Sequence, residues 1–211
     1  DRSPSRGLGD VYKRQILEYL KIGRLVIRPL LELSQINSTS IDFRLGCDFL
    51  VSIQGREPYI DASFQNGHIG NLNNFFQETR RQLGDTFILH PNQTVLASSL
   101  EYIRLPENMM AIIGMRSSYA RLGINISSSL EPGYCGCISL ELTNTSKNAI
   151  RLTVGACMFQ ARLAFITQPE KYNDRKRKYL CQVRPQISNL YTDKDLEILK
   201  KISDKNNNIT T

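Results

Sequence analysis

Residues 131–142 read EPGYCGCISLEL and begin with a Pro-Gly pair that marks a sharp turn. The six residues that end this stretch alternate apolar and polar side chains with a period of two, which predicts a half-buried β-strand. One face of this strand would enter the core through Ile138, Leu140 and Leu142. Glu141 and Ser139 would lie on the opposite face.

Residues 114–123 read GMRSSYARLG and gather groups that bind anions. Arg116 and Arg121 offer planar donor forks that suit phosphate or a polarised carbonyl, and the hydroxyls of Ser117 and Ser118 lie beside them. We expect strand-like backbone here and interpret the stretch as an anion-binding segment.

The charges of Arg116, Arg121 and Glu141 allow two interpretations. Glu141 can serve as a general base if partial burial raises its pKa. Alternatively, the three side chains form a structural ion-pair network on the surface of a sheet. Residue types alone leave both interpretations open.

A second alternating stretch, residues 40–45, reads SIDFRL and predicts another half-buried strand. Ile41, Phe43 and Leu45 would face the core. Asp42 and Arg44 would face the other way, where a sheet ion pair explains them as well as function does.

The run RSSYARLG at 116–123, followed by PGYxGxIxLExxN at 132–144, resembles the central signature of dCTP deaminases, which belong to the dUTPase-like superfamily. Four other segments resemble this family in the same order along the chain: 35–46, 87–106, 155–160 and 178–188. The similarity spans about residues 16–200.

This resemblance implies a mainly β fold, a distorted jelly roll or β-barrel with a few short helices. Many short strand-like runs with frequent turns favour the same architecture. We expect strands at 25–27, 40–45, 86–89, 94–98, 102–105, 110–114 and from 152 onward. We expect helices at 15–21 and near 192–202, and a short helix or a loop at 71–82. The resemblance also implies a homotrimer with active sites shared between subunits.

The resemblance implies a catalytic role for three residues: Glu141 would activate the attacking water, while Ser117 and Arg121 would position it and stabilise the tetrahedral intermediate. Arg116 and Ser118 would bind phosphate, and the backbone of Ser139 and Leu140 would read the pyrimidine edge. The full implied nucleotide-binding set is Arg116, Ser117, Ser118, Tyr119, Ala120, Arg121, Glu131, Ser139, Leu140, Glu141, Gln160, Tyr172, Lys178 and Gln182.

Zinc chemistry does not fit the sequence. Zinc nucleobase deaminases use a His-x-Glu and a Pro-Cys-x-x-Cys signature. Here His68 and His90 are not followed by x-Glu, and the nearest cysteines are Cys135 and Cys137. We expect no metal-ligating side chains, and Mg²⁺ bound only through the nucleotide triphosphate.

Three functions stay open. The first is deamination of dCTP to dUTP and ammonia. The second is a dUTP pyrophosphatase or a bifunctional enzyme that continues to dUMP, although the C-terminus lacks the glycine-rich closing motif of the pyrophosphatases. The third is a non-catalytic nucleotide-binding homologue. Glu131 stands where the family usually has aspartate, and 124–130 is shorter than usual, which affects the prediction of base selectivity.

Composition sets broader limits. The 211 residues carry a net charge of +7, with 41% hydrophobic and 22% charged residues, which is ordinary for a globular protein. The resemblance implies a nucleotide partner, and we expect no nucleic acid. We expect no membrane partner either, because no run reaches the length of a membrane-spanning helix. The five cysteines are odd in number and lack framework-like spacing, so we expect reduced thiols and a cytoplasmic location.

The domain organisation predicted from the sequence has three parts. Residues 1–15 lack periodicity and are interpreted as a non-native tail. Residues 16–204 form a single dCTP deaminase-like domain, and residues 205–211 are a frayed C-terminus.

Overall fold

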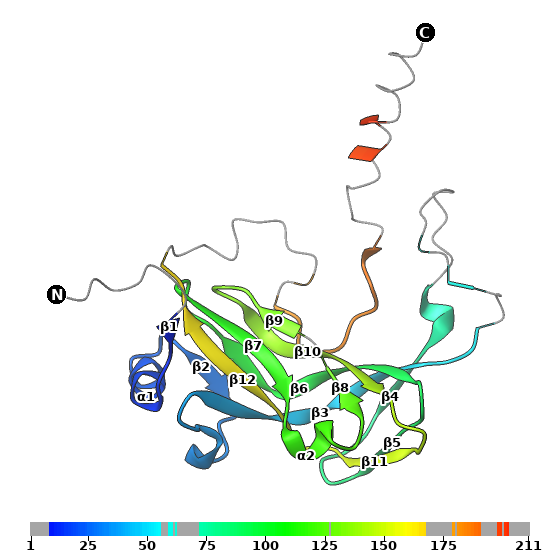
Figure 1. The fold of residues 1–211 in the computed structure, drawn as a ribbon, viewed down its shortest axis with the longest axis horizontal. Helices are drawn as coiled ribbons and strands as arrows, with labels where there is room; N and C mark the ends of the chain where they lie inside the picture. Colours follow the sequence, from blue (N-terminus) through cyan, green and yellow to red (C-terminus); the bar gives the residue numbers. More distant parts are fainter. Residues whose placement is uncertain are drawn as a thin grey trace.

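The computed structural model describes residues 9–55, 59–60, 62, 72–126, 128–167, 179, 181–190, 198–199 and 201–202. Its strands form one curled ten-stranded sheet and a separate two-stranded sheet (Figure 1). The strands are β1 (Gly9–Asp10), β2 (Val26–Arg28), β3 (Ser40–Ser52), β4 (Phe76–Arg80), β5 (Thr86–Leu89), β6 (Thr94–Arg104), β7 (Met109–Met115), β8 (Ile124–Asn125), β9 (Ser128–Leu130), β10 (Cys135–Asn144), β11 (Ile150–Thr153) and β12 (Cys157–Phe165). The helical segments are α1 (Lys13–Lys21), η1 (Leu33–Gln35), η2 (Leu72–Phe75) and α2 (Ser117–Ala120).

The large sheet has the order β8-β10-β6-β3-β12-β7-β9, with β1 beside β12, β2 beside β6 and β4 beside β3. Strand β3 joins its two parts, because residues 40–44 pair with β12 and residues 45–51 pair with β6. Gly46 lies at this change of partner. A Cβ at Gly46 would come within 2.6 Å of the Ser98 carbonyl oxygen, so the close approach requires glycine.

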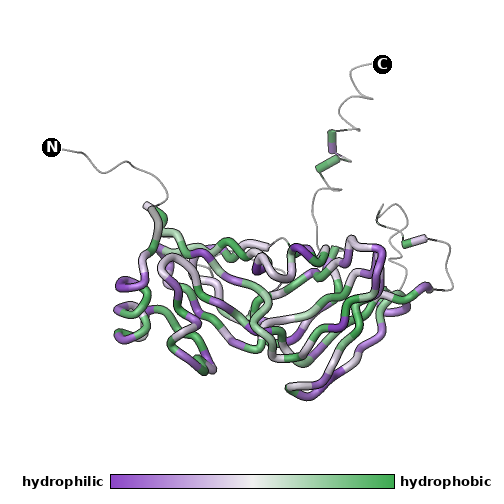
Figure 2. The backbone as a smooth tube through the Cα atoms, turned by 60° about the horizontal axis from the view of Figure 1, so that its bottom comes forward, coloured by the Kyte–Doolittle hydropathy of each residue, from purple (hydrophilic) through white to green (hydrophobic). Residues whose placement is uncertain are grey.

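The long strands β3, β6 and β10 contain many buried residues. Hydrophobic and hydrophilic residues are interspersed along the tube in Figure 2. The predicted core residues of β3 and β10 are buried, namely Ile41, Phe43, Leu45, Ile138, Leu140 and Leu142. Aromatic stacking joins distant segments: the rings of Phe49 and Phe87 are 4.5 Å apart. Burial of these apolar faces is the main term that stabilises the sheet.

The mainly β, dUTPase-like prediction is confirmed, while the homotrimer stays a prediction. Three local expectations differ from the structure. The strands expected at 94–98 and 102–105 are one continuous strand, β6. Ser117–Ala120 forms the short helix α2 instead of strand-like backbone. Residues 76–80 form β4 on the edge of β3, where the sequence predicted a short helix or a loop.

Secondary structure is also present before the predicted domain limit at residue 16. Gly9 and Asp10 pair with β12, α1 begins at Lys13, and Val11 is fully buried. That residues 1–15 are a non-native tail stays a prediction. Residues 198–199 and 201–202 are helical, within the helix expected near 192–202, while residues 191–197 and 200 lie outside the described residues.

The expectation that all cysteines are reduced is wrong for two of them. Cys135 and Cys181 form a disulfide, while Cys47, Cys137 and Cys157 are free. The pair is separated by 46 positions, and only the fold of the C-terminal segment onto β10 brings the two thiols together. None of the helices in the described part of the chain is long and apolar enough to cross a bilayer.

Candidate active site

Three neighbouring strands place one row of residues across the sheet: Asp42 on β3, Gln160 on β12 and Gly114 on β7 are paired in register. Residues directly opposite each other in antiparallel strands point to the same face. Asp42 and Gln160 therefore share a face, and Gly114 leaves that row without a side chain.

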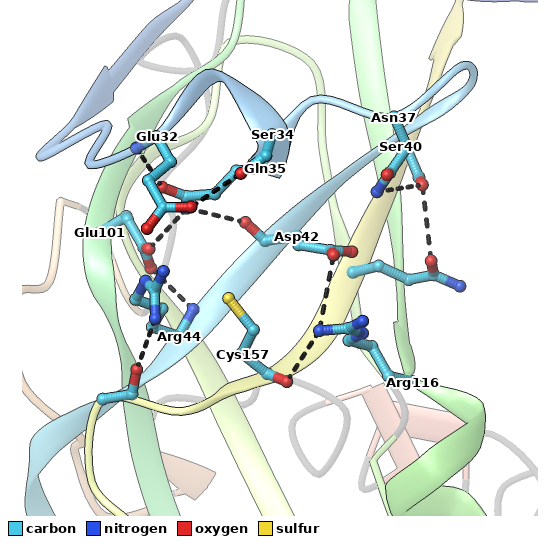
Figure 3. Close-up of polar contacts among 12 residues, drawn as sticks. Glu32, Ser34, Gln35, Asn37, Ser40, Asp42, Arg44, Glu101, Arg116 and Cys157 are labelled. Carbon is cyan, nitrogen blue, oxygen red and sulfur yellow. Dashed lines mark hydrogen bonds and ion pairs between the residues drawn. The ribbon is translucent and has the colours of Figure 1, made fainter. Parts of the chain in front are cut away.

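Arg116 follows β7 and is held at three points. Its backbone N–H donates to the Met158 carbonyl oxygen at 2.9 Å, and its Nη1 donates to the Cys157 carbonyl oxygen at 3.3 Å. Nη1 also lies 3.6 Å from Oδ2 of Asp42, as Figure 3 shows. Among the described residues, the bonds to Cys157 and Asp42 are the only hydrogen bond and ion pair of the Arg116 side chain, so the rest of its donor fork can take a ligand.

Helix α2 presents a polar surface directly after Arg116. The Arg116 carbonyl oxygen accepts from the N–H groups of Tyr119 and Ala120 and so starts the turn. Ser117, Ser118 and Arg121 are exposed, and their side chains make no hydrogen bond or ion pair within the described residues. Each can therefore contact a ligand or a second subunit.

Glu141 lies on β10 and points away from the core, as its spacing predicted. Its side chain reaches solvent, yet neighbouring protein atoms remove part of the carboxylate's water shell. This desolvation raises the pKa of Glu141, while hydrogen bonds from its own backbone and from the Ser139 side chain act in the lowering direction. A carboxylate with a raised pKa is suited to take up a proton and release it again.

A single chain keeps Glu141 apart from Arg121. Strands β8 and β10 are antiparallel, and the Thr145 N–H donates to the Gly123 carbonyl oxygen at 2.8 Å. Gly123, two residues after Arg121, is therefore beside Thr145, four positions or about 14 Å along β10 from Glu141. Neither hydrogen bond nor ion pair joins Arg121 to Glu141 among the described residues.

The structure therefore does not contain the ion-pair network of Arg116, Arg121 and Glu141 that the sequence left open as an alternative. The partner of Arg116 is Asp42, and Asp42 does not pair with Arg44 either. Sequence reasoning left Asp42 and Ser40 out of the candidate site. Their signal was the repeat of polar residues at alternate positions on one face of β3, but their partners lie more than 70 positions away.

The remaining candidates lie around β10. Glu131 is exposed in the turn before β10, and its carbonyl oxygen accepts from the Tyr134 N–H at 3.0 Å. Ser139 and Leu140 pair with β6 on one edge, while β8 pairs only with Thr143 and Asn144 on the other. The backbone beside Ser139 and Leu140 therefore has no strand partner on that second edge in the described structure.

Gln182 is buried, in a segment that lies against the start of β10. Its carbonyl oxygen accepts from the Cys137 N–H at 2.8 Å. Tyr172 and Lys178 lie outside the described residues. Among the residues that are described, no group of three or more His, Cys, Asp and Glu side chains is placed to hold a metal ion.

Comparison with known proteins gives the family. Residues 11–166 match the family model described as dCTP deaminase-like. The chain belongs to the dCTP deaminase-like family. A relative from Methanobrevibacter smithii, named dCTP deaminase, dUMP-forming, is 33% identical over 191 residues, which cover 87% of this chain and 96% of the relative. A dCTP deaminase from Halorubrum lacusprofundi is 34% identical, over 84% of this chain and 89% of the relative.

A solved structure agrees with the fold of this dCTP deaminase-like chain. The crystal structure of 2'-deoxycytidine 5'-triphosphate deaminase from Agrobacterium tumefaciens superposes with a TM-score of 0.57 at 22% identity. The match covers 76% of this chain and 47% of that one, so it spans about half the length of the solved protein.

Proposed function

We propose that this protein is an enzyme that hydrolyses dCTP to dUTP and ammonia. Its support is membership of the dCTP deaminase-like family and the names of its relatives. The observation that carries the proposal is Glu141: a carboxylate with a raised pKa on the polar face of β10, next to Ser139 and Leu140, which have no second strand partner among the described residues.

In the proposed reaction, the oxygen of water bonds to C4 of the cytosine ring. Glu141 takes the proton that this water loses and passes it to ring N3. It then takes the proton of the new C4 hydroxyl and gives it to the amino group, so the C4–N bond breaks, ammonia leaves and C4 keeps a carbonyl oxygen. Ser117 and Arg121 stabilise the charge that develops in the tetrahedral intermediate.

A second subunit would complete this site. The register of β8 and β10 directs Gly123, and the end of α2 before it, away from Glu141 within one chain. We therefore propose a homotrimer in which Ser117 and Arg121 of one subunit approach Glu141 of another, because cyclic symmetry repeats such a shared site at every interface.

The same proposal assigns the remaining candidates to the nucleotide. Arg116 and Ser118 bind the phosphates beside Tyr119 and Ala120, and Glu131 contacts the sugar. The free edge of β10 at Ser139 and Leu140 reads the pyrimidine, and Gln160 makes a further nucleotide contact. Tyr172, Lys178 and Gln182 belong to the C-terminal segment that would close on the triphosphate, and Mg²⁺ would bind to the triphosphate oxygens.

A dUMP-forming reaction is the second candidate, because several relatives carry that name. Incubating the protein with dCTP and Mg²⁺, while ammonia and pyrophosphate are measured separately, distinguishes the two. Ammonia without pyrophosphate supports the dUTP-forming reaction, and both products indicate the dUMP-forming one. Release of neither product would contradict both. We also propose a cytoplasmic location, where a nucleotide substrate of this kind would be met.

A further inference from the structure

The polar face of β3 contacts two of the proposed nucleotide-binding residues. Asp42 pairs with Arg116 on one side, and the hydroxyl of Ser40 lies 3.4 Å from Oε1 of Gln160 on the other. Asp42 and Ser40 are two positions apart, so their side chains leave the strand on the same face. Neither belongs to the nucleotide-binding set inferred from the sequence.

The contact between Asp42 and Arg116 fixes the direction of a guanidinium group. Both the Asp42 carboxylate and the Cys157 carbonyl oxygen lie at Nη1, so one corner of the fork is engaged and the other donors remain free. The Asp42 side chain is 14% exposed and that of Arg116 is 42% exposed. The carboxylate is therefore the more buried partner, and the Arg116 side chain, whose link to Asp42 Figure 3 shows, is the more exposed one.

The contact between Ser40 and Gln160 fixes the direction of an amide. Asn37 Nδ2 donates to the Ser40 oxygen at 3.5 Å, so the Ser40 hydroxyl hydrogen is available for Oε1 of Gln160. The Gln160 amide then has its oxygen engaged and its NH₂ group free to donate. The chain of hydrogen bonds from Asn37 through Ser40 to Gln160 therefore favours a ligand with acceptor oxygens, because the group that Gln160 leaves free is a donor.

Gly114 provides the space that such a ligand needs. It lies in register beside Gln160, and a Cβ built on it would meet no atom within 4 Å. Its backbone conformation does not require glycine, because its φ lies outside the positive range. The open position therefore serves neither packing nor a turn.

We propose that Asp42 and Ser40 are positioning residues, which aim the donors of Arg116 and Gln160 at the acceptor oxygens of one nucleotide triphosphate bound over Gly114. This inference rests on the proposed function for its ligand. It adds two residues of β3 and the open position of Gly114 to the site.

The test measures the binding of dCTP and of inorganic triphosphate by calorimetry, beside kcat and KM for ammonia release. Asp42→Asn should weaken both ligands roughly three- to tenfold and raise KM, with a smaller change in kcat, because a misdirected guanidinium loses charge-assisted hydrogen bonds. Ser40→Ala should weaken dCTP about two- to fivefold.

Asp48→Asn is the matched control. Asp48 lies on the same strand, is 15% exposed and pairs with Arg80 at 3.3 Å, so it loses the same kind of ion pair away from the site. Its binding and KM should equal those of the wild type. Equal losses in Asp42→Asn and Asp48→Asn would overturn the proposal, because they would indicate a general effect on β3.

A double-mutant cycle tests whether Asp42 acts through Arg116. In an Arg116→Gln background, Asp42→Asn should cause no further loss of triphosphate binding. A full additional loss would overturn the proposal, as would recovery of Asp42→Asn at saturating Mg²⁺, because the carboxylate would then act on the metal ion.

Gly114→Leu is an independent variant that should fold normally and lose binding of both ligands, because its side chain would fill the open position. Normal binding by this variant would overturn the proposed location. If the wild type binds dCTP but releases no ammonia, the proposed function fails while the positioning inference remains testable. If ammonia is released and the Asp42 and Gly114 variants match the wild type, only this inference fails.

Discussion

Cys137 donates its backbone N–H to the carbonyl oxygen of Gln182 at 2.8 Å, directly beside the disulfide between Cys135 and Cys181. The disulfide and this hydrogen bond thus hold residues 181 and 182 of the C-terminal segment against β10. These contacts place Gln182, one of the proposed nucleotide-binding residues, at the N-terminal end of β10, the strand that carries Glu141.

We predict that reduction, or Cys181→Ser, loosens this segment. A disulfide that closes a loop of this length stabilises the folded state against the unfolded chain by about 2–4 kcal/mol. Hydrogen exchange of the Cys137 amide should therefore become faster, while Cys47→Ser, which removes a free thiol, should leave it unchanged. A count of three thiols in denaturant without reductant checks the bond, and denaturation is needed because burial raises the pKa of Cys137 to about 11. Five thiols would contradict it.

Gly136→Ala should displace the same segment. Gly136 has φ +143°, and an added Cβ would lie 2.7 Å from the Gln182 carbonyl oxygen. We expect a loss of about 1–3 kcal/mol in the free energy of unfolding, measured by denaturant titration. Gly114→Ala is the control, because its Cβ would meet nothing within 4 Å, and its stability should change little. Equal stability of the two variants would contradict the close contact.

The strands were predictable from the sequence because their side chains alternate. Ile41, Phe43 and Leu45 identify the buried face of β3 without knowledge of any partner strand. Glu141 was placed correctly on the polar face of β10 for the same reason. Such patterns depend on neighbouring residues only, which is the information that a sequence contains directly.

The contacts between distant segments were not predictable in this way. The Asp42–Arg116 pair and the Cys135–Cys181 disulfide join residues 74 and 46 positions apart, and nothing in their own neighbourhoods indicates which partner each one meets. Helix α2 was missed because it has only four residues and no apolar periodicity of its own.

Glu101 should make stability depend on pH. It is fully buried, with Oε1 accepting from Gln35 Nε2 at 3.0 Å and Oε2 accepting from the Arg44 backbone N–H at 2.9 Å. Burial raises the pKa of Glu101 above 4.5 in spite of these hydrogen bonds. The native state therefore favours the protonated form, and the resulting stability is complete below pH 4.5 and lost as pH rises through the raised pKa.

Thermal unfolding of the wild type and of Glu101→Gln across this pH range measures the effect. As pH rises, the Tm of the wild type should fall relative to the Tm of Glu101→Gln, because the amide of the variant does not ionise. The exposed Glu78→Gln is the control and should follow the wild type at every pH. A Tm difference that stays constant with pH would show that Glu101 has an ordinary pKa.

As pH decreases, deamination should be lost at a higher pH than it would be if the catalytic base were a glutamate with an ordinary pKa. The proposed base must be ionised, and desolvation raises the pKa of Glu141, so kcat/KM should fall as pH decreases through that raised value. Glu141→Gln should release ammonia at least about a hundredfold more slowly and still bind dCTP. An acid limb at or below the usual glutamate range, or normal turnover by the variant, would remove Glu141 from its role.

Mixing two inactive variants should restore activity if the site is shared between subunits. In Arg121→Ala every subunit keeps Glu141, and in Glu141→Gln every subunit keeps Arg121. After co-refolding of equal amounts, an interface that joins one subunit of each kind can combine both intact residues. About a quarter of the wild-type ammonia release should return, because random assembly of a cyclic oligomer gives that share of intact interfaces. If Glu141 and Arg121 acted within the same chain, every site would keep one defect and the mixture would stay inactive.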